Sequence, residues 1–303
     1  MVTIHKDYQT INTFDDEEDK QLSDFYHKQS DEEFNNIVTG KTTPVHIYCK
    51  KNDVEMVSIL LFLHKFDVNE KDFEGNCPIH YIFHDKTLPH LSIYIIEFLL
   101  LHNGNINAVN KHGQTAIHLS CKFPLNKITK FLIFKNCNVD ILDVYGKTPI
   151  MYACEFGYIE QVITLIEAGA CVNVDKSHYQ PLHIACLAEY DDIITQINIV
   201  HLLIDSDAHI DAQHKTFLYT PLHCCIFKGN LPLTEFLLIK GANPNIQQVL
   251  GNIPLHITDD VDIAKILVKY KSKLCVKNDI ELTPIETAKI KNKEIYHYLR
   301  SVV

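Results

Sequence analysis

Three histidine–cysteine pairs recur along this chain with a spacing of three residues. They are His46/Cys49, His118/Cys121 and His183/Cys186, and a related pattern stands at His223, Cys224 and Cys225. Residues three apart share one face of a helix, and imidazole and thiolate both bind zinc. A structural zinc site takes four ligands, however, whereas each pair offers two and the next pair is at least a repeat away. We therefore expect structural side chains here and no metal site.

Other patterns that support chemistry do not occur in the sequence. There is no Cys-x-x-Cys pair, no Gly-x-Ser-x-Gly turn, no phosphate-binding glycine loop and no His-Glu-x-x-His helix. Six of the eighteen histidines belong to a repeated phrase and the others are scattered, which does not favour a pH switch. We predict no enzymatic activity and no cofactor.

The elements that carry these side chains are repeats of one short phrase. The clear copies are Thr-Pro-Val-His at 43–46, Thr-Ala-Ile-His at 115–118, Thr-Pro-Ile-Met at 148–151 and Thr-Pro-Leu-His at 220–223. Degenerate copies begin at Cys77, Gln180, Ile253 and Thr283. Successive copies start 30 to 40 residues apart, and a period near 33 is typical of a solenoid of helix pairs.

The third copy explains why each repeat folds as a pair of helices. Gly113 allows the positive φ of a hairpin tip, and Thr115 is suited to cap the helix that follows. A second helix is predicted for residues 126–135, where apolar residues recur on one face. Neither helix can bury its apolar face alone, so the pairs must stack. We predict eight units, from about residue 40 to Val303.

The phrase and its period resemble the ankyrin-repeat family from Gly40 onward, most closely at 148–173 and 220–245. The resemblance implies an all-α solenoid of about eight stacked helix pairs with β-hairpin loops, formed by residues 40–303. It also implies that the histidine of the phrase bridges backbone groups of neighbouring hairpins and that the cysteine fills a small core position. Such an array offers an extended surface rather than a closed pocket, which favours a binding protein.

Some units depart from the family pattern. Units two and five are long, at 38 and 40 residues, and we expect their extra residues, around 85–90 and 191–198, to lie between the paired helices. Units six and eight lack the turn glycine, where Leu218 and Glu281 stand instead. Their hairpins are predicted to be less regular.

The charge distribution excludes several partner classes. The net charge is −10, of which residues 1–39 contribute −7 through ten acidic residues and three lysines, so the repeat region is close to neutral. Arg300 is the only arginine, against 27 lysines. Nucleic acids and anionic membranes require a basic surface, and arginine is the preferred residue for reading phosphates and bases. We expect another protein as the partner and neither nucleic acid nor membrane.

Targeting signals are also absent from the sequence. The N-terminus has no apolar signal region, and the most apolar run, residues 91–101, is half the length of a membrane span. Ten cysteines without a signal peptide predict reduced thiols. We expect a monomeric cytoplasmic protein, which in the case of a virus or pathogen would work in the host cytoplasm or nucleus.

Residues 1–39 form an acidic N-terminal segment with alternative interpretations. It is either a solvated tail or a docking element for a basic partner segment. Within residues 21–38, four apolar residues are spaced loosely enough for a degenerate capping helix pair, and the sequence leaves this open.

The resemblance also assigns candidate contact residues, because ankyrin proteins bind partners on the concave side, through hairpin tips and the ends of first helices. The aromatic and histidine residues at those offsets are Phe73, His112, Phe123, Tyr145, Phe156, Tyr179, Phe217, Tyr219 and Phe227. Exposed aromatic residues in a row indicate an interface, because such residues dominate binding hot spots.

We therefore predict a non-catalytic scaffold that acts as an adaptor or inhibitor along this strip. One alternative is a transcription-factor inhibitor that masks a basic segment with its acidic flank. Another is a substrate receptor for a ubiquitin ligase, although the last residues of the chain still belong to a repeat and no F-box-like segment is present.

Overall fold

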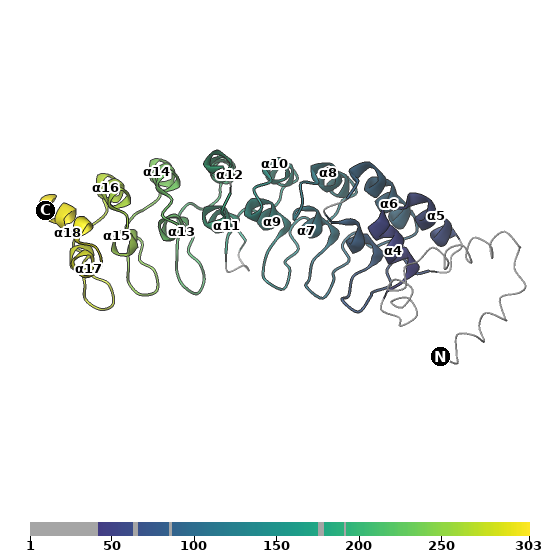
Figure 1. The fold of residues 1–303 in the computed structure, drawn as a ribbon, viewed down its shortest axis with the longest axis horizontal. Coiled ribbons are helices and arrows are strands. Elements are labelled where there is room, and N and C mark those ends of the chain that lie inside the picture. Colours follow the sequence, from purple (N-terminus) through teal and green to yellow (C-terminus); the bar gives the residue numbers. More distant parts are fainter. Residues whose placement is uncertain (1–41, 63–65, 85–86, 175–178, 191) are drawn as a thin grey trace, which may run out of the picture.

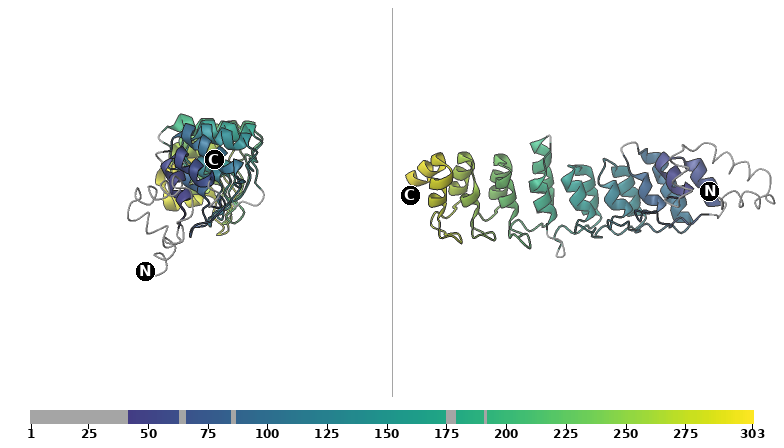
Figure 2. Two further views of the ribbon diagram at one scale, coloured as in Figure 1. Left: turned by 90° about the vertical axis from the view of Figure 1, so that its right-hand side faces the viewer. Right: turned by 60° about the horizontal axis from the view of Figure 1, so that its bottom comes forward.

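The computed structural model is an elongated, gently curved stack of helix pairs (Figures 1 and 2). It describes residues 42–62, 66–84, 87–174, 179–190 and 192–303. Within these ranges there are fifteen α-helices, one 3-10 helix and no strand. The predicted all-α solenoid of eight helix pairs is confirmed.

Each unit consists of a first helix beside the hairpins and a second helix behind it (Figure 1). In order, the pairs are α4 (Pro44–Lys51) with α5 (Val54–Phe62), η1 (Pro78–Ile82) with α6 (Pro89–Leu101), α7 (Ala116–Ser120) with α8 (Asn126–Phe134), α9 (Pro149–Glu155) with α10 (Ile159–Glu167), α11 (Pro181–Leu187) with α12 (Ile193–Asp205), α13 (Pro221–Phe227) with α14 (Leu231–Ile239), α15 (Pro254–Ile257) with α16 (Val261–Lys269) and α17 (Pro284–Lys291) with α18 (Lys293–Ser301).

The loops between units are hydrogen-bonded hairpins. In unit three the amide of Asn110 donates to the carbonyl of Gln114 at 3.1 Å, and the amide of Gly113 donates back to the carbonyl of Asn110 at 2.9 Å. Neighbouring hairpins are also linked, since the amide of Val144 donates to the carbonyl of His112 at 2.9 Å. Equivalent bonds join the hairpins of units two and three, six and seven, and seven and eight, and the described hairpins lie along one side of the array (Figure 2).

An Asp, Asn or Gln side chain starts each regular hairpin that the structure describes. In unit four, Oδ1 of Asp143 accepts hydrogen bonds from the amides of Tyr145 and Lys147, both at 2.9 Å. Such a side chain satisfies backbone donors that the tight turn leaves open, which is why Asp and Asn are favoured at this position. The tip is thereby fixed without help from the side chains at its exposed end.

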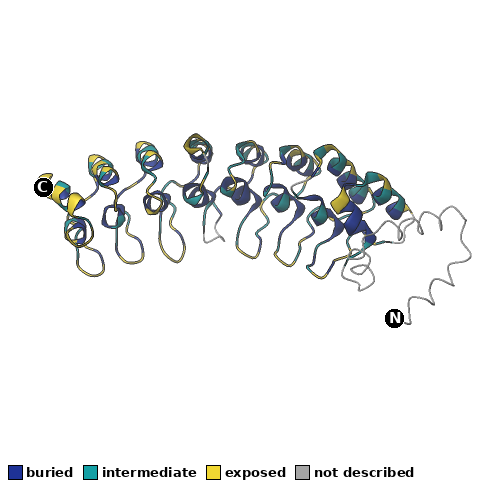
Figure 3. Cartoon of the chain, viewed as in Figure 1, coloured by how far each residue is buried: buried dark blue, intermediate teal, exposed yellow. Residues whose placement is uncertain are grey.

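The apolar residue of the phrase points into the core between successive units. Leu182, Leu222 and Ile150 are fully buried, and the first helices of units one to seven are largely buried (Figure 3). Full burial of such a side chain stabilises the fold by about 1.5–3 kcal/mol. The predicted register of the repeat is confirmed.

The two long units place their extra residues differently from the prediction. Helices α6 and α12 have 13 residues each, whereas the other second helices have nine. Helix α12 already begins at Ile193, because Asp192 caps it by accepting from the amides of Ile194 and Thr195, both at 3.0 Å. Helix α6 begins at Pro89, which is suited to the first helical position. The prediction that these extra residues lie between the helices is therefore wrong for 89–90 and 193–198, which are helical, and correct for 87–88 and 192. Residues 85–86 and 191 lie outside the described residues.

The two hairpins without glycine also differ from each other. Leu218 and Glu281 both adopt positive φ, at 56° and 62°, a conformation that costs a residue with a Cβ about 1–2 kcal/mol. In unit six the closing bond joins His214 to Tyr219 and encloses one residue more than usual, so the predicted irregularity is confirmed. In unit eight the bonds have the same spacing as in glycine hairpins, and the prediction is wrong there.

No helix in the described ranges is long and apolar enough to cross a membrane. The acidic residues 1–39 lie outside the described residues, so the capping helix pair stays a prediction.

Candidate protein-interaction site

The phrase histidines use both ring nitrogens for the scaffold. In unit three, Nδ1 of His118 accepts from the amide of Thr115 at 3.2 Å, and Nε2 donates to the carbonyl of Lys147 in the next hairpin at 3.2 Å. In unit five, Nε2 of His183 donates to the carbonyl of Tyr219 at 2.9 Å. The same bridge starts from the other phrase histidines, namely His46, His80, His223 and His256.

Burial keeps these imidazoles neutral. It lowers the pKa of His118, His183 and His223 to about 4, and it lowers the pKa of the other three phrase histidines as well. A neutral ring with one accepting and one donating nitrogen matches both backbone partners. The predicted structural role of the histidines is confirmed.

The same geometry removes the histidine–cysteine pairs from metal chemistry. A ring whose two nitrogens are both hydrogen-bonded has no lone pair left for a cation. Burial also raises the pKa of the Cys121 thiol to about 12, so the thiolate that zinc requires does not form near neutral pH. In the part of the chain that the structure describes, no three His, Cys, Asp or Glu residues gather in a way that could hold a metal ion.

Large apolar side chains stand exposed at the hairpin tips of most units. The exposed fraction is 56% for Phe73, 66% for Tyr145, 46% for Phe217, 60% for Leu250 and 71% for Ile280. They belong to units two, four, six, seven and eight, and the hairpin edge is accordingly largely exposed (Figure 3). Because the hairpins are closed by backbone and Asx bonds, folding does not require apolar residues at these tips.

In units five and six, four predicted contact residues form one cluster together with His214. The ring of His214 lies 4.3 Å from that of Tyr179 and 5.3 Å from that of Phe217. Phe217 stacks on Tyr219 at 5.7 Å, and Tyr219 meets Phe227 edge to face at 4.8 Å. We call these five residues the aromatic cluster.

The aromatic cluster is fixed on its inner side and exposed to solvent on its outer side. His214 is buried, and Tyr179 and Tyr219 are half-buried. The carbonyl of Tyr219 accepts from both His183 and the amide of His214, which fixes the backbone under the rings. Phe217 and Phe227 are 46% and 49% exposed, so the cluster presents apolar ring surface that costs little conformational entropy to bind.

The other predicted contact residues are not brought together in this way. Phe73, His112 and Tyr145 are exposed on separate tips, and Phe156 stacks on Tyr158 at 6.1 Å. Phe123 is half-buried and packs against the core. The structure thus gathers four of the nine candidates, Tyr179, Phe217, Tyr219 and Phe227, and leaves the other five outside the cluster.

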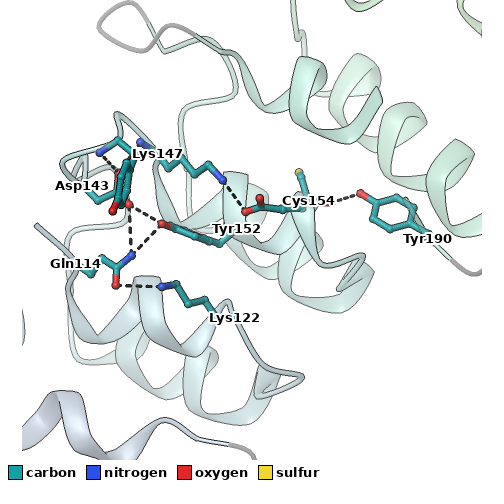
Figure 4. A network of polar contacts seen from close by, with 9 residues as sticks. Gln114, Lys122, Asp143, Lys147, Tyr152, Cys154 and Tyr190 are labelled. Carbon is teal, nitrogen blue, oxygen red and sulfur yellow. Dashed lines mark hydrogen bonds and ion pairs between the residues drawn. The ribbon is translucent and has the colours of Figure 1, made fainter. Parts of the chain in front are cut away.

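Units three and four carry a network of polar side chains where units five and six carry the aromatic cluster (Figure 4). The hydroxyl of Tyr152 donates to Oδ2 of Asp143 at 2.6 Å and accepts from Nε2 of Gln114 at 2.9 Å. Nζ of Lys122 donates to Oε1 of Gln114 at 3.1 Å, and Nζ of Lys147 pairs with Glu155 at 2.7 Å. The network joins the hairpins of units three and four to the first helix of unit four.

Both lysines of this network also lie close to one aromatic ring. Nζ of Lys122 is 4.8 Å and Nζ of Lys147 is 5.1 Å from the ring centre of Tyr152, within cation–π range. Burial lowers the pKa of Lys122, and burial together with the Asp143 bond raises the pKa of Tyr152. This part of the face is therefore polar and internally satisfied.

His214 and Tyr152 were not among the sequence candidates. The signal for His214 was available, because it occupies the hairpin position where other units have Asp, Asn or Gln, and its Nδ1 accepts from the amides of Thr216 and Phe217 at 3.1 Å. The longer hairpin of unit six obscured that equivalence. A signal for Tyr152 was also available, because Tyr81 stands at the same phrase offset in unit two. Its hydroxyl donates to Oδ2 of the equivalent hairpin residue, Asp72, at 2.5 Å.

Comparison with protein families gives matches along most of the array. The family model described as Ankyrin repeats (3 copies) matches residues 90–176, 124–214 and 174–248, and the model described as Ankyrin repeat matches residues 41–73.

Curated relatives come from animals, bacteria and viruses. The chain is 28% identical over 258 residues to the B-cell lymphoma 3 protein homolog of Mus musculus, covering 81% of this chain and 54% of that protein. It is 37% identical over 101 residues to an ankyrin repeat protein of Rickettsia felis, covering 29% of this chain and 44% of that protein. It is 30% identical over 158 residues to the ankyrin repeat protein FPV031 of fowlpox virus, with 48% and 45% coverage. The chain thus spans about half the length of these relatives.

Solved structures share the fold at low sequence identity. The ankyrin repeat domain of Bcl-3, described as a unique member of the IkappaB protein family, gives a TM-score of 0.60 at 20% identity and covers 86% of this chain and 98% of that one. The ankyrin repeat domain of human ASB11 gives a TM-score of 0.57 at 18% identity, with 86% and 97% coverage. The repeat phrase, the stacked helix pairs and the family matches agree, and the chain belongs to the ankyrin-repeat family.

Proposed function

We propose that this chain is a non-catalytic scaffold that binds a partner protein along its hairpin tips and first helices and acts as an adaptor or inhibitor. The observation that carries the proposal is the aromatic cluster of Tyr179, His214, Phe217, Tyr219 and Phe227, extended by exposed apolar residues on other tips. Protein-binding hot spots are rich in aromatic residues fixed by their surroundings, and repeat arrays provide long surfaces for such contacts.

The two parts of the face suit different roles in recognition. The aromatic cluster can bury ring area against apolar residues of a partner, which supplies affinity. The Tyr152 network in units three and four already satisfies its own polar atoms, so it would contribute orientation and selectivity more than affinity. The partner is therefore expected to depend most strongly on units five and six.

The state of the cysteines supports a proposal for the working compartment. All ten cysteines are unpaired thiols. Because unpaired thiols are typical of reducing compartments, we propose that the protein acts in the cytoplasm, or in the nucleus, of the cell in which it works. We also propose that it acts as a monomer.

A second candidate is inhibition of a transcription factor. It is favoured by the likeness to the Bcl-3 ankyrin repeat domain, whose title names the IkappaB protein family, and by the acidic residues 1–39, which could mask a basic segment. This candidate differs from the first in a testable way, because it requires the N-terminal segment for binding.

Affinity capture from a eukaryotic cell lysate tests both candidates. The wild-type chain is compared with a variant in which Tyr145, Phe156, Tyr219 and Phe227 are alanine, and with a chain that lacks residues 1–39. A matched control is Phe134→Ala, because Phe134 is 75% exposed at the end of α8, a second helix. Circular dichroism checks that each variant folds.

A partner that is retained by the control and lost by the fourfold variant supports recognition along the hairpin face. A partner that survives the fourfold variant and disappears with residues 1–39 contradicts it and favours the masking candidate.

A further inference from the structure

One junction between neighbouring units lacks the histidine bridge that joins the others. In unit four the phrase ends in Met151, which is fully buried and stands where His118 and His183 stand in the adjacent units. A thioether accepts hydrogen bonds only weakly and donates none, so it can neither hold the N-cap nor reach the next hairpin. By position, the carbonyl that a histidine here would meet is that of Tyr179.

The missing histidine leaves a buried polar atom unsatisfied. The hydroxyls of Thr43, Thr115 and Thr220 each lie 2.7–2.9 Å from Nδ1 of the histidine three residues later. Oγ1 of Thr148 is buried and has no hydrogen-bond partner. An unsatisfied buried hydroxyl is destabilising, so the defect at unit four is present in the cap as well as in the bridge.

The last unit shows that loss of histidine alone does not create this defect. Glu286 replaces the histidine there, and its Oε2 accepts from both the amide and the hydroxyl of Thr283 at 2.8 Å. In unit eight the polar side chain therefore still holds the cap. Among the phrase threonines, all of which lie in the described ranges, Thr148 is the one with an unpaired hydroxyl.

Other contacts across the same junction are present but different in kind. The hydroxyl of Tyr190 donates to the carbonyl of Cys154, and the amide of Cys171 donates to Oδ1 of Asp140 at 2.8 Å. Helices α9 and α11 also pack through buried apolar residues. The junction is thus closed by apolar packing and contacts at its edges, without the central bridge.

We propose that this junction divides the array into two blocks, units one to four and units five to eight, which are coupled less tightly than neighbours joined by a histidine. In a linear repeat array, stability is transmitted only through interfaces between neighbours, so a weak interface separates cooperative units. The Tyr152 network belongs to the first block. All five residues of the aromatic cluster belong to the second block, with Tyr179 at the start of unit five and the other four in unit six. The two parts of the interaction face therefore respond separately to destabilisation.

A coupling experiment tests the proposal with the full chain. The sequence has no tryptophan, so single reporters can be introduced as Phe123→Trp in unit three and Phe236→Trp in unit six, both at half-buried positions. Urea unfolding is followed by the fluorescence of each tryptophan, with and without the substitution Leu222→Ala, which leaves a cavity in unit six. We expect Leu222→Ala to lower the midpoint at the unit-six reporter by about 1 M urea and to leave the unit-three reporter almost unchanged.

Introducing the bridge should change the result. With Met151→His, the same cavity is expected to shift both reporters together, whereas Met151→Leu, which keeps the position apolar, should behave as the native chain. An equal shift of both reporters in the chain with Met151 would overturn the proposal, whether or not the histidine variant folds. Separate shifts that persist in a folded Met151→His chain would also overturn it, because the missing bridge would then not be the cause.

Discussion

Units three and four and units five and six have the same backbone plan but present different surfaces to a partner. In the first pair the central side chain of the face is Tyr152, whose hydroxyl is enclosed by Asp143 and Gln114 and whose ring lies near two lysines. In the second pair, aromatic rings touch one another and Phe217 and Phe227 remain about half exposed. The difference shows that the repeat scaffold determines where side chains lie. The types of these side chains decide whether they satisfy one another's hydrogen bonds or leave apolar surface exposed for a partner.

Acid is expected to have the largest effect, because it acts on the scaffold that both regions share. The folded-state pKa of His118, His183 and His223 is about 4, below the ordinary value of 6.5, so the unfolded chain binds more protons below pH 6.5. Stability is therefore complete above pH 6.5 and falls progressively as the pH drops toward 4. Between pH 7 and pH 5 we expect a loss of about 2 kcal/mol for each of these histidines.

Urea unfolding at a series of pH values measures this loss. The variant His118→Gln should show a shallower dependence on pH than the native chain. A stability that stays constant from pH 7 to pH 5 would contradict the bridged, neutral histidines.

Deleting a core leucine should have the next largest effect. Leu222→Ala in unit six removes a fully buried side chain and is expected to cost about 2–5 kcal/mol, and Leu182→Ala in unit five should cost a similar amount. The matched control is Leu250→Ala, since Leu250 is 60% exposed at a hairpin tip. If the buried leucines cost no more than this control, the register of the repeat would be wrong.

Breaking the Tyr152 network tests whether the polar side chains of units three and four stabilise the fold. Tyr152→Phe leaves Oδ2 of Asp143 without its shortest donor, and we expect a loss of about 1–3 kcal/mol in unfolding free energy. Partner binding through the aromatic cluster should be retained. Thermal unfolding and a binding assay on the same sample separate the two effects, and a stability equal to that of the native chain would show that the network is not structural.

The smallest effect is expected at a surface ion pair beside the aromatic cluster. Lys228 and Glu189 lie 2.5 Å apart, but the glutamate is 83% exposed, so solvent screens the interaction. Lys228→Met should therefore leave the unfolding midpoint unchanged within error. A clear fall in stability would indicate that this pair, and not only the rings, holds units five and six together.

The sequence was sufficient to predict the fold because one phrase recurs once in each unit of the array. Buried residues such as Leu182 and bridging residues such as His183 could be assigned from their offsets alone. The helix lengths of units two and five were predicted less well, because Pro89 and Asp192 start their helices within the stretches expected to be loops.

The candidate site was predicted residue by residue but not as a cluster. Positions relative to the repeat phrase identified Phe217, Tyr219 and Phe227. The contacts between their rings, however, depend on the extra residue in the unit-six hairpin and on His214, which packs against Phe217. The offset of Tyr152, which Tyr81 shares in unit two, points to the hydrogen bond with the hairpin aspartate, but it does not show that Gln114 of the preceding hairpin also reaches the hydroxyl. Contacts between units depend on side-chain geometry that a repeat pattern does not contain.

The most direct test of the account is to titrate the captured partner against two alanine variants of the same size. One variant replaces Tyr219 and Phe227 in the aromatic cluster, and the other replaces Tyr145 and Phe156 in unit four. We expect the first variant to weaken binding about 30-fold or more, equivalent to about 2 kcal/mol, and the second to weaken it much less, with both variants folded. Equal affinity of the first variant and the native chain would contradict recognition through the aromatic cluster.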